Sequence, residues 1–274
     1  MIQRIIPSSG EKLPVIGLGT WQTFDVKDKK EYKPLVDVLK NMYEGGGRLI
    51  DTSPMYGQSE TVIGEITNEM MEKDAFFYAT KVWTQGKEEG IRQMNDSFEK
   101  MKRTTMELIQ IHNLVDWKTH LNTLRKWKEE GKIKYIGITH YMDNMHEELA
   151  DVLSKEKIDF VQFNYSIFSR NAEKKLLPLC IDKGVATLIN RPFGEGKIFA
   201  RVKNKKVPAW TKEYRIDNWS QYFLKYIVSH PAVSCVIPAT KNPDHMLDNI
   251  RSGENPELDE TTRQRMIREI ENIS

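Results

Sequence analysis

The chain has 274 residues, enough to bury a full hydrophobic core, and its 41 Lys and Arg residues are nearly balanced by 39 Asp and Glu. This balance argues against a nucleic-acid-binding or membrane-surface protein, since both usually carry a basic excess. No apolar run approaches the roughly 20 residues that cross a bilayer, the amino terminus has no signal-peptide core, and the two cysteines lack metal-site spacing. We therefore expect a globular, cytoplasmic protein with reduced thiols, and nothing in the sequence requires more than a monomer.

The first predicted element is a β-hairpin over residues 4–16 that turns at Ser8–Gly10. Eight short apolar segments typical of buried parallel strands follow, over residues 14–20, 48–53, 76–83, 106–112, 134–140, 158–166, 185–193 and 233–240. Helices are predicted between them, for example over residues 32–46, 88–102 and 120–132, and a final helix over residues 257–273.

Strict alternation of strands and helices predicts a parallel sheet, because parallel strands need long crossovers. Eight units in a chain of this length fit a closed (β/α)8 TIM barrel, with the hairpin across its bottom, as a single domain over residues 1–274. A doubly wound open sheet is the alternative, but no strand is followed by a GxGxxG sequence. A long basic stretch, residues 194–215, interrupts the pattern; its lysines are either a solvated face or a flap over a phosphate group.

Four titratable residues lie at or near the carboxyl ends of predicted strands two to four: Asp51, Tyr56, Lys81 and His112. A barrel gathers these strand ends at one mouth, where the active sites of this fold lie. Each residue alone is more often a turn, surface or satisfied polar group. All four at one rim indicate an acid–base system.

Each of the four residues has a chemical role in such a system. Tyr56 would donate a proton, although its ordinary pKa of about 10 is high for work near neutrality. The Lys81 ammonium would lower that pKa, and Asp51 would pair with Lys81. Neutral His112 would hydrogen-bond the substrate oxygen. The group suits protonation of a nascent alkoxide, and therefore reduction of a carbonyl compound.

These motifs resemble those of the aldo-keto reductase family, over essentially the whole chain. The segment DTSPMYG, residues 51–57, resembles the family pattern DTAxxYG, while TKVW carries Lys81 and IQIHN carries His112. The resemblance, to a bacterial-type member with a short C-terminal tail, implies a (β/α)8 barrel that reduces aldehydes or ketones with NADPH, with NADH possible. Hydride would pass from the nicotinamide to the carbonyl carbon while Tyr56 donates the proton.

The resemblance also implies further site residues. The substrate pocket would be lined by Trp21, Tyr56, Trp83 and His112. The cofactor would be bound by Thr20, Asp51, Thr139, His140, Gln162, Asn190, Arg191, Pro192, Phe193, Thr240, Lys241, His245 and Asn249. Gln162 would bind the nicotinamide carboxamide. Lys241 would neutralise a 2′-phosphate, next to the anion-binding start of a helix that is capped by Asn242.

The chain departs from the family pattern in the cofactor segments. Thr139-His140 replaces Ser-Asn, Asn190 replaces a tyrosine that often stacks on the nicotinamide, Ala239-Thr240 replaces Lys-Ser, and His245 replaces Arg. These changes leave the choice between NADPH and NADH open, and Arg191 could hold a pyrophosphate or an acidic substrate instead. The short C-terminal end predicts an open pocket that accepts small aldehydes broadly.

Other functions fit less of the pattern. A non-catalytic NADPH-binding sensor or regulatory subunit is possible on the same barrel, but it has no need for Tyr56 and Lys81 together. A glycoside hydrolase needs a second carboxylate, and no other strand end supplies one. Metal catalysis is not predicted, because the six histidines include no HExxH pattern or ligand cluster.

Overall fold

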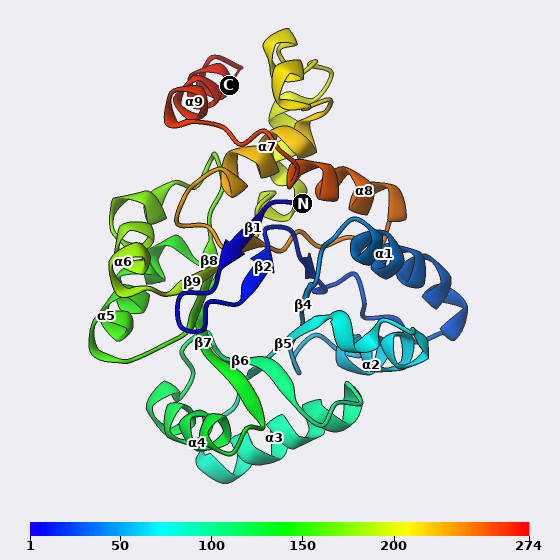
Figure 1. The fold of residues 1–274 in the computed structure, drawn as a ribbon, viewed down its shortest axis with the longest axis vertical. Coiled ribbons are helices and arrows are strands. Elements are labelled where there is room, and N and C mark those ends of the chain that lie inside the picture. The colour runs from blue at the N-terminus through cyan, green and yellow to red at the C-terminus, as the bar shows by residue number, and fades with distance from the viewer. Residues whose placement is uncertain (274) are drawn as a thin grey trace.

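The computed structural model describes residues 1–273, which form a ring of eight parallel strands with helices around it (Figure 1). The strands are β3 (Leu18–Gly19), β4 (Leu49–Asp51), β5 (Phe77–Val82), β6 (Met106–His112), β7 (Ile133–Thr139), β8 (Phe160–Asn164), β9 (Ala186–Asn190) and β10 (Cys235–Val236). They pair in chain order, and parallel bridges from Ile16 to Val236 and from Gly19 to Ala239 join the first strand to the last. The predicted barrel is confirmed.

Helices connect successive strands and cover the outside of the barrel (Figure 1). They are α1 (Tyr32–Glu44), α2 (Ser59–Glu69), α3 (Lys87–Lys100), α4 (Trp117–Glu129), α5 (His146–Lys155), α6 (Leu176–Lys183), α7 (Trp219–Val228), α8 (Pro243–Ser252) and α9 (Glu260–Ile273). The amphipathic spacing places one face of each helix in the core. Helix α4 begins at Trp117, before the predicted residue 120, and Trp117 also packs against the core. Within residues 1–273, no helix combines the length and apolar character needed to cross a membrane.

The amino-terminal hairpin consists of antiparallel strands β1 (Gln3–Ile5) and β2 (Lys12–Pro14). Its turn contains Gly10 at φ +79°, a conformation that glycine adopts without strain. Figure 1 shows the hairpin lying across the barrel. Ile6 and Leu13 are buried in the same apolar cluster as Leu49 and Phe160, which lie near the amino ends of barrel strands. The hairpin therefore closes the bottom of the barrel, as predicted, and leaves the carboxyl ends of the strands for a site.

The basic stretch after β9, residues 194–215, packs against the core. It contains two 3-10 segments, η5 (Gly194–Val202) and η6 (Ala209–Tyr214). Phe199 joins η5 to the core, with ring centroids 5.1 Å from Phe193 and 5.7 Å from Phe223 of α7. These contacts hold the stretch over the same end of the barrel as the candidate catalytic residues.

Candidate active site

The four predicted catalytic residues lie together at the carboxyl end of the barrel. Asp51 ends β4, Lys81 lies in β5, His112 ends β6, and Tyr56 lies in the loop after β4. The Lys81 Nζ atom is 2.7 Å from Asp51 Oδ2 and 4.9 Å from the centroid of the Tyr56 ring. The ring centroids of Tyr56 and His112 are 5.9 Å apart. The structure thus brings together residues that are up to 61 positions apart in the sequence (112 − 51).

Lys81 is completely buried and donates hydrogen bonds to Asp51 Oδ2 and to the Thr52 carbonyl oxygen, each at 2.7 Å. Burial disfavours the ammonium ion, but the Asp51 carboxylate and Tyr56 more than offset it, so the pKa of Lys81 is raised. Lys81 therefore places a fixed positive charge beside the phenol.

The pKa of Tyr56 differs from the expectation that Lys81 brings it down. Burial raises it, the Lys81 ammonium lowers it, and Asp51 raises it, with the net result above the ordinary value of 10.0. Lys81 acts in the predicted direction but does not overcome burial. The phenol consequently stays protonated at neutral pH, which is the state that a proton donor needs.

His112 is neutral for physical reasons that the structure makes clear. Burial, the Lys81 charge and His140 lower the pKa of His112 from 6.5 to about 2. Its Nδ1 atom lies 3.1 Å from Ser53 Oγ, whereas Nε2 has no hydrogen-bond partner among residues 1–273. The uncharged ring lines the cavity described below and has one nitrogen free for a ligand.

Gln110 is a buried member of the site that the sequence analysis missed. Its Nε2 atom donates to Asp51 Oδ1 at 2.8 Å, and it is fully buried in β6. A Cβ atom at Gly137 of β7 would come within 2.7 Å of the Gln110 Cγ atom, so the glycine makes room for the amide. The signal was present: Gln110 stands two positions before His112, and alternate strand residues share a face.

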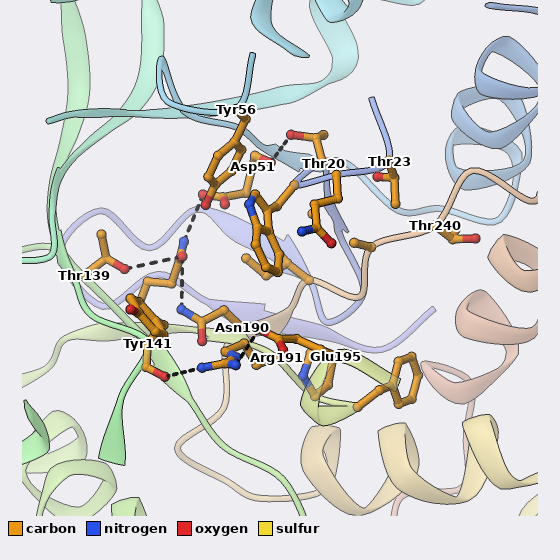
Figure 2. Close-up of a pocket in the computed structure, with 18 of the residues that line it drawn as sticks. Thr20, Thr23, Asp51, Tyr56, Thr139, Tyr141, Asn190, Arg191, Glu195 and Thr240 are labelled. Atoms are coloured by element: carbon orange, nitrogen blue, oxygen red, sulfur yellow. Dashed lines mark hydrogen bonds and ion pairs between the residues drawn. The ribbon is translucent and has the colours of Figure 1, made fainter. Parts of the chain in front are cut away.

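Gln162 continues this network from Asp51 toward β7 and β9. Its partners Asp51, Thr139 and Asn190 are labelled in Figure 2. Its Nε2 atom donates to Asp51 Oδ1 at 2.9 Å and to Gln110 Oε1 at 3.1 Å. Its Oε1 atom accepts from Thr139 Oγ1 at 3.4 Å and from Asn190 Nδ2 at 3.3 Å. All the hydrogen-bonding positions of the Gln162 amide are therefore used within the protein, where the resemblance implied a contact to the cofactor carboxamide.

A cavity of about 740 Å³ opens above these residues. Asp51, Tyr56 and His112 line it, while Lys81 lies beneath its surface. Its rim carries partly exposed apolar side chains, including the predicted Trp21 and Trp83 as well as Met55 and Tyr141. A cavity of this size, with a few polar groups set in an apolar wall, is typical of a site for small organic ligands.

Comparison with known proteins agrees with this geometry. The profile of the Aldo/keto reductase family matches residues 15–271. The chain belongs to this family. It is 27% identical to methylglyoxal reductase YeaE of Escherichia coli (strain K12), over 91% of this chain and 89% of that protein. It is 25% identical to the NADH-specific methylglyoxal reductase of the same organism, over 77% of this chain and 73% of that protein.

Solved structures of the family have the same fold. An aldo-keto reductase from Klebsiella pneumoniae in complex with NADPH superposes with a TM-score of 0.82, at 21% identity, over 98% of this chain and 96% of that chain. The thermostable aldo-keto reductase Tm1743 in complex with the inhibitor epalrestat superposes with a TM-score of 0.80, at 22% identity, over the full length of both chains. Both likenesses show that the barrel is the aldo-keto reductase barrel.

Most residues that the resemblance assigned to the cofactor line the cavity of this aldo-keto reductase. They are Thr20, Asp51, Thr139, Gln162, Asn190, Arg191, Pro192, Phe193, Thr240, His245 and Asn249. The buried Thr23 Oγ1 and Asn190 Oδ1 atoms have no hydrogen-bond partner within residues 1–273, and both residues belong to the cavity wall. Unpartnered polar atoms in a cavity wall fit a ligand with many polar groups, such as a dinucleotide.

Two residues assigned to the cofactor lie elsewhere. His140 does not line the cavity; its carbonyl oxygen accepts from Asn190 Nδ2 at 3.5 Å. Lys241 lines a separate hollow with Lys30 and Glu31. The neighbouring helix start is nonetheless built as predicted, because Asn242 Oδ1 accepts from the Asp244 backbone N–H at 2.9 Å.

Arg191 is held by two residues that the sequence analysis did not identify. Its guanidinium lies 5.1 Å from the centroid of the Tyr141 ring, and it forms an ion pair with Glu195. Arg191 and Glu195 have φ angles of +49° and +59°. These left-handed conformations are uncommon for residues other than glycine, and the sequence did not predict them. An anionic ligand that binds Arg191 must compete with Glu195.

No group of three His, Cys, Asp or Glu side chains in residues 1–273 is arranged to hold a metal ion.

Proposed function

We propose that this aldo-keto reductase reduces aldehydes or ketones to alcohols with NADPH or NADH, and that Tyr56 is the proton donor. The observation that carries the proposal is the buried Lys81 ammonium, held by Asp51 at 2.7 Å and lying 4.9 Å from the Tyr56 ring centroid. A bound nicotinamide supplies the hydride. The residues of the chain supply the proton and orient the carbonyl group.

The proton transfer uses the three groups in different ways. The neutral His112 ring donates a hydrogen bond from its free nitrogen to the carbonyl oxygen and turns that oxygen toward Tyr56. The Tyr56 phenol then gives its proton to the oxygen as the carbonyl carbon accepts hydride. The Lys81 charge stabilises the phenolate that remains, and Asp51 keeps the ammonium in place.

Small 2-oxoaldehydes and related aldehydes are the substrate class that we propose. Relatives include reductases of methylglyoxal and a glyoxal reductase from Bacillus subtilis (strain 168) that is 24% identical over 88% of this chain. The partly exposed rim residues Trp21 and Trp83 leave the cavity mouth open, which favours broad acceptance of small carbonyl compounds.

Use of either nucleotide is consistent with the charges of the cavity wall. Within residues 1–273, Arg191 is the only Arg or Lys residue that lines the cavity, and it already forms an ion pair with Glu195. A 2′-phosphate would thus meet His245 and the amino end of α8 rather than a dedicated cation. The site is formed within one chain and both cysteines are free, which supports a monomer in a reducing compartment such as the cytoplasm.

The proposal is tested by following oxidation of NADPH and NADH with glyoxal, methylglyoxal and a panel of larger aldehydes. Tyr56→Phe is expected to lower kcat by about 10²- to 10⁴-fold with little change in the nucleotide Kd, because it removes only the donated proton. Tyr141→Phe, a second tyrosine of the cavity wall, is the matched control and should retain activity. Nucleotide binding without any turnover in the unmodified protein would favour the sensor function instead.

A further inference from the structure

Ser53 contacts His112 and Tyr56, the two residues that face the substrate oxygen in the proposed function. Its Oγ atom lies 3.1 Å from His112 Nδ1, and its carbonyl oxygen accepts a hydrogen bond of 3.0 Å from the Tyr56 backbone N–H. Ser53 is fully buried and does not line the cavity.

The hydrogen bonds of Ser53 favour one direction for its contact with the ring, from the hydroxyl to Nδ1. Its Oγ atom already accepts from the Met55 backbone N–H, at 3.4 Å. The hydroxyl carries one proton, and within residues 1–273 the acceptor that it reaches is His112 Nδ1. If Nδ1 carried a proton instead, Ser53 Oγ could accept it with its second lone pair, but the buried hydroxyl proton would then have no acceptor. A buried unsatisfied donor costs about 1–3 kcal/mol.

We propose that Ser53 is a positioning residue that selects the tautomer of His112: its hydroxyl donates to Nδ1, so the ring proton resides on Nε2 and is presented to the carbonyl oxygen. The catalytic meaning of this inference rests on the function proposed above. Tautomers are assigned from the surrounding hydrogen bonds, and here one residue supplies all of them.

The surroundings of His112 offer no second way of selecting the tautomer. Tyr56 and Trp83 also contact the ring, with centroids 5.9 and 6.4 Å away, while Lys81 and His140, which lower the pKa of His112, form no hydrogen bond with it within residues 1–273. Because the ring is neutral, it carries one proton on one of two nitrogens, and only the Nδ1 side has a polar partner in the described chain. Loss of the Ser53 hydroxyl therefore leaves both tautomers accessible before substrate binds.

Ser53→Ala is the variant that tests the idea, since it keeps the carbonyl oxygen that holds the Tyr56 turn. We expect kcat for carbonyl reduction to fall about 3- to 10-fold, the equivalent of one neutral hydrogen bond, with the nucleotide Kd unchanged. Ser59→Ala is the matched control: Ser59 is equally buried, but its hydroxyl accepts from Thr52 Oγ1 at 3.2 Å and does not touch His112.

The direct measurement is nitrogen NMR of protein labelled with ¹⁵N-histidine, with the His112 signals identified by their loss in His112→Gln. The proposal predicts an unprotonated Nδ1 and a protonated Nε2 in the unmodified protein and in Ser59→Ala, and a mixture of tautomers in Ser53→Ala. A protonated Nδ1 in the unmodified protein, or an unchanged tautomer in Ser53→Ala, overturns it.

Kinetics and NMR separate this inference from the proposed function. If the unmodified protein reduces no carbonyl compound but shows the expected nitrogen signals, the proposed function fails and the tautomer assignment stands. If it reduces carbonyl compounds with the opposite tautomer, the inference fails and the function stands. A change in nucleotide Kd as large as the change in kcat in Ser53→Ala points to general disruption and also overturns the proposal.

Discussion

Two parts of the molecule around the cavity, the β4–β6 side and the segment beyond β10, are built on opposite principles. On the β4–β6 side, Asp51, Lys81 and Gln110 are at most 2% exposed, and the Asp51 carboxylate accepts three side-chain hydrogen bonds. Beyond β10, Lys241 and His245 are exposed and form no ion pair within residues 1–273. One part is a closed network, and the other consists of separate groups in solvent.

This difference decides where substitution is tolerated. A buried charge is costly unless a partner compensates it, so each member of the β4–β6 network depends on the others. An exposed charge is screened by water and contributes little, so it can be replaced at small cost. The departures from the family pattern at Ala239 and His245 fall in the solvated part, and those at Thr139 and Asn190 fall beside Gln162 at the edge of the buried network. Asp51, Tyr56 and Lys81 match the pattern.

Lys81→Met is expected to have the largest effect of the substitutions that test this difference. It leaves the Asp51 carboxylate buried without its ion-pair partner, which typically costs about 3–5 kcal/mol of unfolding free energy. Activity should also fall by at least about 10²-fold, because the phenolate left by Tyr56 loses its neighbouring charge. Urea unfolding and nucleotide oxidation measure the two effects.

The double variant Lys81→Met/Asp51→Asn is the control for that experiment. Removing the stranded charge should recover most of the lost stability but none of the activity, since Asn cannot replace the ammonium beside Tyr56. A single variant that unfolds at the same urea concentration as the unmodified protein would show that the pair is not a buried, mutually dependent unit.

Gln110→Met tests whether the network extends beyond the charged pair. The unbranched Met side chain fits beside Gly137 but cannot donate to Asp51 Oδ1, and a hydrogen bond to a charged group is worth about 1.5–3 kcal/mol. We expect unfolding free energy to drop by this amount and kcat to fall about tenfold. Gln264→Met, which removes an exposed amide on α9, should change neither quantity.

The sequence predicted that the four candidate catalytic residues lie together because parallel strands constrain their positions. Asp51 and His112 end apolar runs, and barrel topology alone requires such ends to meet. Gln110 was missed because it stands inside an apolar run, where only its shared face with His112 marks it. Tyr141 and Glu195 were missed for another reason: their contacts depend on left-handed backbone conformations at Arg191 and Glu195, which the sequence does not specify.

The direction of a pKa shift was harder to predict than the position of a residue. The depth at which Tyr56 is buried cannot be read from the sequence, and burial decides the sign of its pKa shift. After β10, the position of a side chain was itself hard to predict. Lys241 is adjacent to the helix start in sequence, but the capped turn at Asn242 places it toward Lys30 and away from the cavity.

Because His112 is neutral in the folded protein, we expect the free energy of unfolding to fall at acidic pH. Its folded pKa of about 2 lies below the unfolded value of 6.5, so its contribution to stability is present above pH 6.5 and is lost as the pH falls toward 2. At pH 5 the loss should be about 2 kcal/mol, from 1.36 kcal/mol per pH unit. Unfolding of His112→Gln should consequently depend less on pH between about 7.5 and 5 than unfolding of the unmodified protein.

His230 provides the comparison within the same molecule. Burial lowers the pKa of His230 to about 4, so His230→Gln should also reduce the pH dependence, but it lies outside the cavity wall and should leave kcat unchanged. Equal pH dependence in His112→Gln and the unmodified protein would mean that His112 can take up a proton in the folded state.

Lys241→Ala should have the smallest effect. Lys241 is exposed and lines the hollow with Lys30 rather than the main cavity, so its removal should change the Kd for NADPH by less than about threefold, within the range of an exposed charge. His245→Ala, in the cavity wall, is the matched variant; fluorescence titration with NADPH and NADH measures both. A tenfold loss confined to NADPH in Lys241→Ala would mean that Lys241 turns toward the 2′-phosphate when nucleotide binds. The solvated part of the site would then be ordered by its ligand, whereas the β4–β6 network is ordered before the ligand arrives.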